Sequence, residues 1–244
     1  MKQFLLFLML AGCNQDGGFL WWGGENGEEL SESEAMYVLT EECGEKIYAG
    51  DVYSCDEDSD GNYSNCKNDP DDYAFLDGYT SIHGDVFLRM DGTLDLDIFK
   101  YLSQIRCVDG DMSVMPTATS SNFTEAGLQS LSSLQKITGN FNASAVFLAS
   151  LTAMQTVGGD FSLEDTSYGL DDVSALERIG GNLTTVGLSD LNGIFGLTYL
   201  GKNMDFNVTF IPQCEVDAFA AKMRGLGWDG ELISGANNGT GGCE

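Results

Sequence analysis

Residues 148–163 read LASLTAMQTVGGDFSL, and the spacing of the apolar side chains in this stretch recurs along most of the chain. With Val157 as position 0, apolar residues stand at −9, −6, −3, 0, +4 and +6, and a glycine stands at +2. Repeats about 20 to 30 residues long are typical of stacked solenoids, in which each coil covers the apolar face of its neighbour. Five more rows share this register and are polar at these positions only at Thr185; their origins are Ile82, Val108, Ile137, Ile179 and Leu200.

The register predicts a strand-dominated α/β solenoid. Side chains two apart lie on the same side of a pleated strand, so positions +4 and +6 predict one short strand per row in a parallel sheet. We expect the run from −9 to 0 to form a short helix or tight coil behind that sheet. Fainter copies of the register at residues 48–52 and 228–232 are expected to cap the two ends.

A C-terminal cap helix is predicted over the final coil. Its expected buried face has the spacing i, i+3, i+4, i+7, which is typical of an amphipathic helix. Acidic residues near its start and basic residues near its end agree with the helix dipole. The four apolar residues are Val216, Phe219, Ala220 and Met223.

Three stretches of the repeat resemble the receptor L domain, the leucine-rich-repeat-like module of insulin-type and epidermal-growth-factor-type receptors. They read LSSLQKITGNFNAS (131–144), LTAMQTVGGDFSL (151–163) and VSALERIGGNLTTV (173–186). The resemblance implies a right-handed solenoid in an extracellular setting, and it extends to predicted bacterial surface proteins. It implies no chemistry, because the shared positions are core and turn residues.

The amino terminus predicts export. Lys2 is followed by a short apolar run, which is typical of a secretory signal rather than of a membrane-spanning helix. Leu10-Ala11-Gly12-Cys13 resembles the bacterial lipobox, in which the cysteine is acylated and anchors the protein; an ordinary cleavage site with a disulfide-bonded or buried Cys13 is the alternative. We therefore expect a signal peptide at 1–12, an acidic, glycine-rich flexible tether at 13–42 and the solenoid with its caps at 43–244.

Six cysteines remain when Cys13 is set aside, which fits up to three disulfides in an oxidising compartment. Cys55 with Cys66 would close a short acidic insert. Cys214 with Cys243 would bracket the last cap, which leaves Cys43 with Cys107 by elimination. Fifteen pairings are formally possible, so other connectivities stay open.

The net charge of −27, from 38 acidic and 11 basic residues, opposes binding to nucleic acid and to polyanionic glycans. One acidic segment resembles the first half of a calcium loop, with Asp56, Asp58, Asp60 and Asn62 as candidate ligands. Lys67 stands where such a loop needs a bidentate glutamate, so an unliganded surface loop is the alternative. No other cofactor is expected: the chain has one histidine, His83, and no Cys-x-x-Cys pair for zinc.

Two outward columns of the repeat are candidates for function. The +3 column is mostly Asp and Asn, which favours backbone hydrogen bonding in the Gly-Asx turn over a ladder that binds cations. The +5 column has a small, polar centre, which suits a protein-sized partner better than a deep small-molecule pocket. The candidate binding residues of the +5 column are Ser113, Asn142, Ser162, Thr184 and Asp205.

The predicted function is that of a non-enzymatic lipoprotein of the cell envelope, at the outer membrane or cell surface, whose solenoid binds an extracellular protein or glycan. One alternative is a β-solenoid enzyme acting on polysaccharides. Another is a calcium-stabilised structural or adhesion protein. No nucleophile and base pair stands out in the sequence, so no catalytic residue is predicted.

Overall fold

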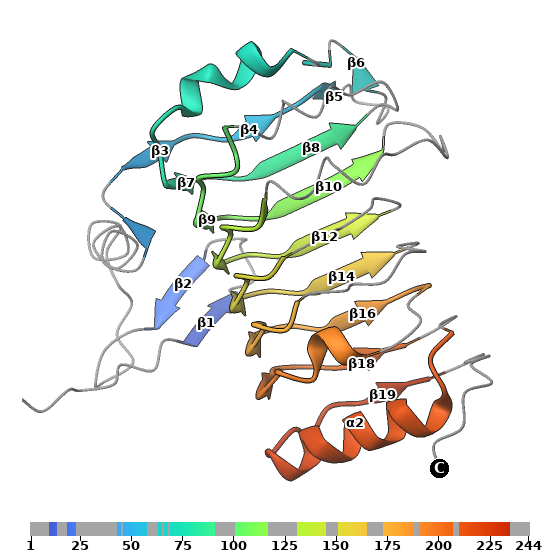
Figure 1. The fold of residues 1–244 in the computed structure, drawn as a ribbon. Helices are drawn as coiled ribbons and strands as arrows, with labels where there is room; N and C mark the ends of the chain where they lie inside the picture. The colour runs from blue at the N-terminus through green and yellow to red at the C-terminus, as the bar shows by residue number, and fades with distance from the viewer. Residues whose placement is uncertain are drawn as a thin grey trace, which may run out of the picture.

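Each coil of the computed structural model except the last contributes two parallel strands, one to each of two sheets, and the last contributes one strand to the larger sheet (Figure 1). The strands alternate between the sheets along the chain, so the architecture is a parallel solenoid of stacked repeats. The structure describes residues 10–13, 19–22, 43–44, 46–57, 63–64, 66–67, 69–90, 101–116, 131–144, 151–164, 173–187, 191–206 and 210–234.

The eight-stranded sheet contains the +4 to +6 positions, as the sequence predicted. Neighbouring coils pair in register; Phe141 lies beside Phe161, for example, and Phe161 beside Leu183. Its strands are β4 (Val52–Tyr53), β8 (Val86–Met90), β10 (Met112–Pro116), β12 (Phe141–Ser144), β14 (Phe161–Glu164), β16 (Leu183–Thr185), β18 (Met204–Asp205) and β19 (Leu232–Ile233).

The seven-stranded sheet was not predicted. It contains position 0, where we expected the end of a helix or coil. Its strands are β3 (Ile47–Ala49), β7 (Ser81–His83), β9 (Cys107–Asp109), β11 (Lys136–Ile137), β13 (Thr156–Val157), β15 (Arg178–Ile179) and β17 (Tyr199–Leu200).

In most of the described coils the apolar residues three apart belong to single turns rather than to helices of several turns. The backbone N–H of Met154 donates to the carbonyl of Leu151, and the N–H of Leu176 donates to that of Val173. These bonds span three residues, as in a 3₁₀ turn, after which the chain extends into the seven-stranded sheet. Within the described parts of these segments, η1 (Pro70–Leu76) and η4 (Asn192–Ile194) are 3₁₀ helices.

The core is a continuous apolar column between the two sheets. Leu151, Leu176 and Leu197 are at most 1% exposed, as their place in the register requires. The rings of Phe141 and Phe161 stack with centroids 5.4 Å apart, which continues the packing from one coil to the next. Thr185 is also fully buried. The interior is therefore filled by side chains, and the surface is left for binding.

Both ends of the solenoid are capped. At the C-terminal end, α2 (Gln213–Gly225) covers the last coil and buries the four apolar residues predicted for it. Lys222 of α2 donates to the backbone carbonyls of Phe195 and Leu197, which fastens the helix to the coil beneath it. At the N-terminal end, η1 packs its buried Tyr73 and Leu76 against the first coil.

Two antiparallel strand pairs lie outside the solenoid sheets. Strand β1 (Leu10–Cys13) pairs with β2 (Phe19–Trp22), so part of the segment expected as signal and tether is a hairpin. Strand β5 (Asp56–Glu57) pairs with β6 (Tyr63–Ser64) in the insert between the predicted cysteines. Among the described residues, no helix is long and apolar enough to span a bilayer.

One disulfide connects the N-terminal cap to the repeats, and another closes the insert. Cys43 is bonded to Cys107 and Cys55 to Cys66, the pairings that the sequence favoured. Cys214 is disulfide-bonded as well, while its predicted partner Cys243 lies outside the described residues. Disulfides persist in oxidising compartments, so these bonds indicate an extracytoplasmic location.

Candidate functional site

The +3 column forms a continuous hydrogen-bonded ladder along the solenoid. In each coil the side-chain oxygen of the +3 residue accepts a hydrogen bond from the backbone N–H of the +3 residue in the following coil. The seven bonds measure 2.7 to 3.2 Å. The ladder runs through Asp51, Asp85, Asp111, Asn140, Asp160, Asn182, Asn203 and Glu231.

This geometry corrects one detail of the sequence interpretation. The Asp and Asn side chains do bond to backbone donors, but the donor lies on the next coil rather than in the same turn. The bonds also explain the glycine at +2: a Cβ on Gly181 would lie 2.0 Å from Asp160 Oδ1. Because no side chain fits in that space, the glycine and the Asx residue of the preceding coil are required together.

The side chains of the ladder join neighbouring coils through hydrogen bonds. Burial raises the pKa of Asp85 above its ordinary value, and the nearby carboxylates of Asp111 and Asp51 add to the rise, while the hydrogen bond from the Asp111 backbone lowers it. Among the described residues, no group of three or more His, Cys, Asp or Glu side chains is arranged to hold a metal ion.

The +5 column forms a straight row on the outer face of the eight-stranded sheet. We call it the outer row, and each member is the strand partner of the next. All five predicted binding residues stand in it. From the N-terminal end the outer row contains Tyr53, Phe87, Ser113, Asn142, Ser162, Thr184, Asp205 and Ile233.

Aromatic rings mark the N-terminal end of the outer row. The rings of Tyr53 and Phe87 stack with centroids 5.3 Å apart and an angle of 10° between their planes. Tyr53 is 44% exposed, and its hydroxyl donates to the carboxylate of Asp51. Burial raises the pKa of Tyr53, with the charge of Asp51 contributing, so this hydroxyl stays protonated at neutral pH.

Two adjacent side chains of the outer row carry polar atoms without partners. Ser113 lies between Phe87 and Asn142 and is 6% exposed. Its Oγ and the Oδ1 of Asn142 are both buried and make no hydrogen bond. Buried polar atoms without partners are uncommon in native proteins because each carries a desolvation cost. Here the two lie side by side on the outer surface of a sheet.

A second polar group lies on the outer side of the seven-stranded sheet. His83 Nδ1 lies 2.6 Å from Asp109 Oδ2, and Thr138 Oγ1 donates to Asp109 Oδ1 over 2.8 Å. The three residues occupy successive coils. Sequence reasoning found no partner for His83, because Asp109 is 26 residues away and only the coil register places it alongside.

The pair of His83 and Asp109 resembles the base and orienting carboxylate of many hydrolases. The hydroxyl among the described contacts of the pair, that of Thr138, bonds to Asp109 rather than to His83. The side chain of Asp109 is 7% exposed, and Asp109 also holds Thr138. The arrangement is explained by its role in linking three coils.

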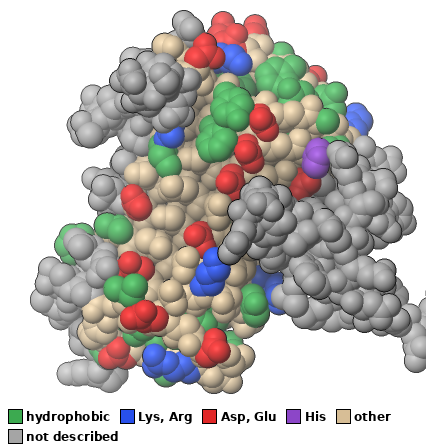
Figure 2. Space-filling view, turned by 180° about the vertical axis from the view of Figure 1, so that it is seen from behind, with side chains coloured by type: hydrophobic (Ala, Val, Ile, Leu, Met, Phe, Trp, Pro, Cys, Tyr) green, Lys and Arg blue, Asp and Glu red, His purple; other side chains and the backbone are tan. Residues whose placement is uncertain are grey.

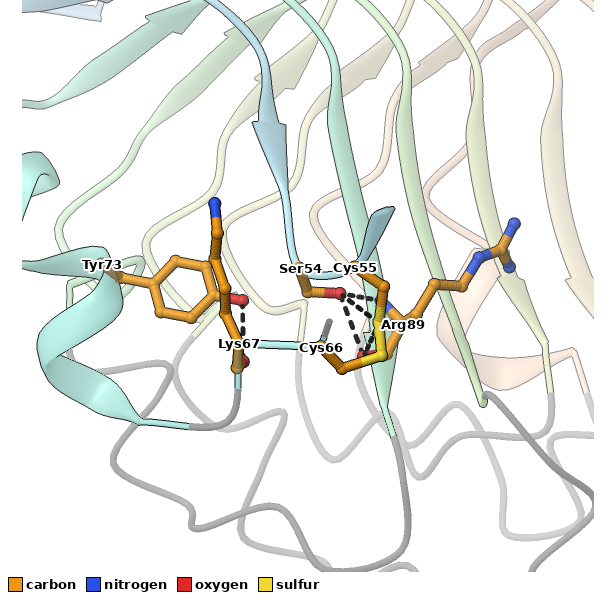
Figure 3. The surroundings of a disulfide bond; sticks show 6 residues. All are labelled: Ser54, Cys55, Cys66, Lys67, Tyr73 and Arg89. Carbon is orange, nitrogen blue, oxygen red and sulfur yellow. Dashed lines mark hydrogen bonds between the residues drawn. A yellow bond between two sulfur atoms is a disulfide. The ribbon is translucent and has the colours of Figure 1, made fainter. Parts of the chain in front are cut away.

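The predicted calcium loop is only partly described. Asp56 lies in β5 opposite Ser64, whereas Asp58, Asp60 and Asn62 fall outside the described residues. Figure 3 shows the base of this insert, where the disulfide of Cys55 and Cys66 lies next to Ser54 on the edge of the sheet. Ser54 Oγ accepts from the backbone N–H of Arg89 and donates to its carbonyl. Calcium binding stays a prediction.

Nearby, Tyr73 fastens the end of the insert to η1. Its hydroxyl donates to the backbone carbonyl of Lys67 (Figure 3). Burial raises the pKa of Tyr73 to about 12, so the hydroxyl remains a hydrogen-bond donor through the physiological pH range. The base of the insert is thus held at two points, by a disulfide and by a buried tyrosine.

The surface seen in Figure 2 carries acidic side chains from one end of the solenoid to the other. This distribution agrees with the net charge of −27. A surface of one dominant sign repels polyanions over about one Debye length, roughly 8 Å at physiological ionic strength.

Comparisons of the chain with models of known protein families, with curated proteins and with solved structures find no match. The class of protein defined by the fold is a parallel solenoid of stacked repeats with two sheets and a C-terminal helix.

Proposed function

We propose that this chain is an exported, lipid-anchored surface protein of the L-domain-like type, which binds an extracellular protein or glycan through the outer row and catalyses no reaction. The lipobox-like segment ending at Cys13 supports the anchor, and the disulfides support the extracytoplasmic setting. The interior is closed by packed side chains, so a ligand has to be bound at the surface.

The observation that carries this proposal is the pair of unpartnered polar atoms on Ser113 and Asn142. In the ladder, by contrast, the repeated polar side chains are satisfied by the neighbouring coil. At the centre of the outer row, Ser113 Oγ and Asn142 Oδ1 have no such hydrogen-bond partner within the protein. A ligand that hydrogen-bonds to these atoms would offset the desolvation cost that they impose on the unbound protein.

A matched pair of variants tests the proposal. Ser162 in β14 and Thr156 in β13 belong to the same coil but to different sheets, and both are half-buried. We expect the full chain with Ser162→Arg to lose capture of its native cell surface or extracellular matrix, because the arginine projects from the middle of the outer row. Thr156→Arg should retain capture. Equal capture by both variants would refute the assignment of the outer row.

A further inference from the structure

Resting on the proposed function, we propose that the ligand of the outer row is a neutral glycan, held by stacking on the aromatic pair and by hydroxyl hydrogen bonds to Ser113 and Asn142. The central observation is the sequence of neighbours Tyr53, Phe87, Ser113 and Asn142 along one straight row. Aromatic rings and unsatisfied polar atoms occur there as direct strand neighbours.

The aromatic pair offers the apolar part of such a site. Tyr53 and Phe87 stack on each other, so their rings stand together on the sheet surface. Phe87 is half-buried and is flanked on its other side by the short side chain of Ser113. The C–H faces and edges of a pyranose are apolar and pack against aromatic rings, while its hydroxyls stay at the periphery.

The polar atoms require a ligand that both donates and accepts. Asn142 Oδ1 accepts only, whereas the Ser113 hydroxyl donates and accepts. A sugar hydroxyl does both, so one hydroxyl can donate to Asn142 while another pairs with Ser113. The side chain of Asn142 is half-buried but its Oδ1 is fully buried, so binding requires the amide to rotate and expose this oxygen.

The charge of the site excludes acidic glycans. The outer row contains no Lys or Arg and one carboxylate, Asp205, while the ladder of Asp51, Asp85 and Asp111 runs beside it two residues earlier in each coil. Sulfated or uronic acid chains would be repelled by these carboxylates.

The shape of the row favours a chain over a single sugar. Its rungs repeat every ~4.8 Å, the spacing of neighbouring strands, which is close to the length of one pyranose unit. Ser162 and Thr184 continue the row with further hydroxyls beyond Asn142. A linear oligosaccharide lying across the strands can thus meet a new polar side chain at each rung.

The test uses the full chain on an array of neutral hexose and N-acetylhexosamine oligosaccharides, with sulfated and uronic acid chains beside them. We expect binding to neutral oligosaccharides only. Phe87→Ala and Asn142→Ala should each weaken that binding by about tenfold or more, and Thr156→Arg should leave it unchanged. Near-ultraviolet circular dichroism identifies any variant that is misfolded, and Asn142→Ser then serves as a milder replacement.

The outcomes separate this inference from the proposed function. In one outcome, Ser162→Arg abolishes capture of the native surface, and capture is also lost when the surface is treated with protease but not when it is oxidised with periodate. That outcome supports the proposed function and overturns the glycan inference. Binding to acidic chains alone, or neutral binding that no outer-row variant changes, also overturns the glycan inference. Capture that Ser162→Arg leaves intact overturns both.

Discussion

The carboxylate of Asp160 accepts a hydrogen bond from the backbone N–H of Asn182, 2.7 Å away on the next coil. The same oxygen also accepts a hydrogen bond from the side-chain amide of Asn182 at 3.0 Å.

An amide oxygen accepts as well as a carboxylate does, so Asp160→Asn is expected to keep the free energy of unfolding within about 0.5 kcal/mol of the wild type. Asp160→Leu removes the acceptor and should lower it by about 1–3 kcal/mol. Urea unfolding of both variants measures the difference, and equal losses would contradict the ladder.

Gly181 provides a second test of the same contact. Its replacement by alanine places a Cβ 2.0 Å from Asp160 Oδ1, with backbone atoms of Gly159 and Asp160 also too close. The coil has to shift, and we expect a loss of at least about 2 kcal/mol. Gly225→Ala is the control: no heavy atom lies within 4 Å of its added Cβ, and it ends α2. That change should be neutral or stabilising by up to about 1 kcal/mol.

Asp85 should make the stability of the protein depend on pH. Its pKa is raised in the folded state, mainly by burial, so the folded protein holds this proton more tightly than the unfolded chain. Its contribution is therefore favourable below the ordinary carboxyl pKa of 3.8 and is lost as pH rises through the raised value.

Asp85→Asn keeps the acceptor for Asp111 and removes the charge. Relative to the wild type it should gain stability as pH rises, by up to about 1 kcal/mol at pH 7, and gain little near pH 3. Thermal unfolding at the two pH values measures this. A variant that is less stable than the wild type at pH 7 would show that the charge itself is needed.

Thr185 is the single polar residue in the inward register, and its hydroxyl is buried without a hydrogen-bond partner. Thr185→Val replaces the hydroxyl with a methyl group of similar size. We expect unfolding to cost about 1–2 kcal/mol more, because an unsatisfied buried hydroxyl is removed. Chemical denaturation measures the gain. Thr184→Val, on the opposite face of β16, is the comparison and should change stability by less than about 0.5 kcal/mol.

Asp109 joins His83 and Thr138 across three coils, and its loss should cost more than the loss of either partner. Asp109→Ala leaves two polar side chains without their acceptor, so we expect about 2–4 kcal/mol of destabilisation. His83→Ala leaves Asp109 bonded to Thr138 and should cost less, because His83 is one-third exposed. The reverse order would indicate that the histidine has a role apart from linking coils.

The inward positions of the repeat could be predicted from the sequence because buried positions carry apolar side chains. Leu151, Leu176 and Leu197 are apolar at matching positions, and they are buried. The cap helix followed from its apolar spacing for the same reason. The bond of Cys55 with Cys66 was predicted from their short separation along the chain, and that of Cys43 with Cys107 by elimination.

The seven-stranded sheet could not be predicted in this way, because its pairing uses backbone groups that every residue carries. The strand at Thr156–Val157 has only one inward side chain, so no alternation indicates it. The partner of His83 was missed because contacts between coils depend on the exact length of each loop. The unpartnered atoms of Ser113 and Asn142 depend on local geometry, of which residue type gives no sign.

The ladder has a polarity that bears on how long this molecule can be. Each acceptor serves the coil that follows it, and both Asp and Asn occur as acceptors along the ladder. In a duplicated coil inserted between two such coils, the backbone N–H donates to the Asp or Asn of the preceding coil. Its own Asp or Asn accepts from the backbone N–H of the following coil. Gain or loss of whole coils therefore preserves the hydrogen bonds between coils and changes only the length of the outer row. The length of the solenoid can thus vary without a change in its interior packing.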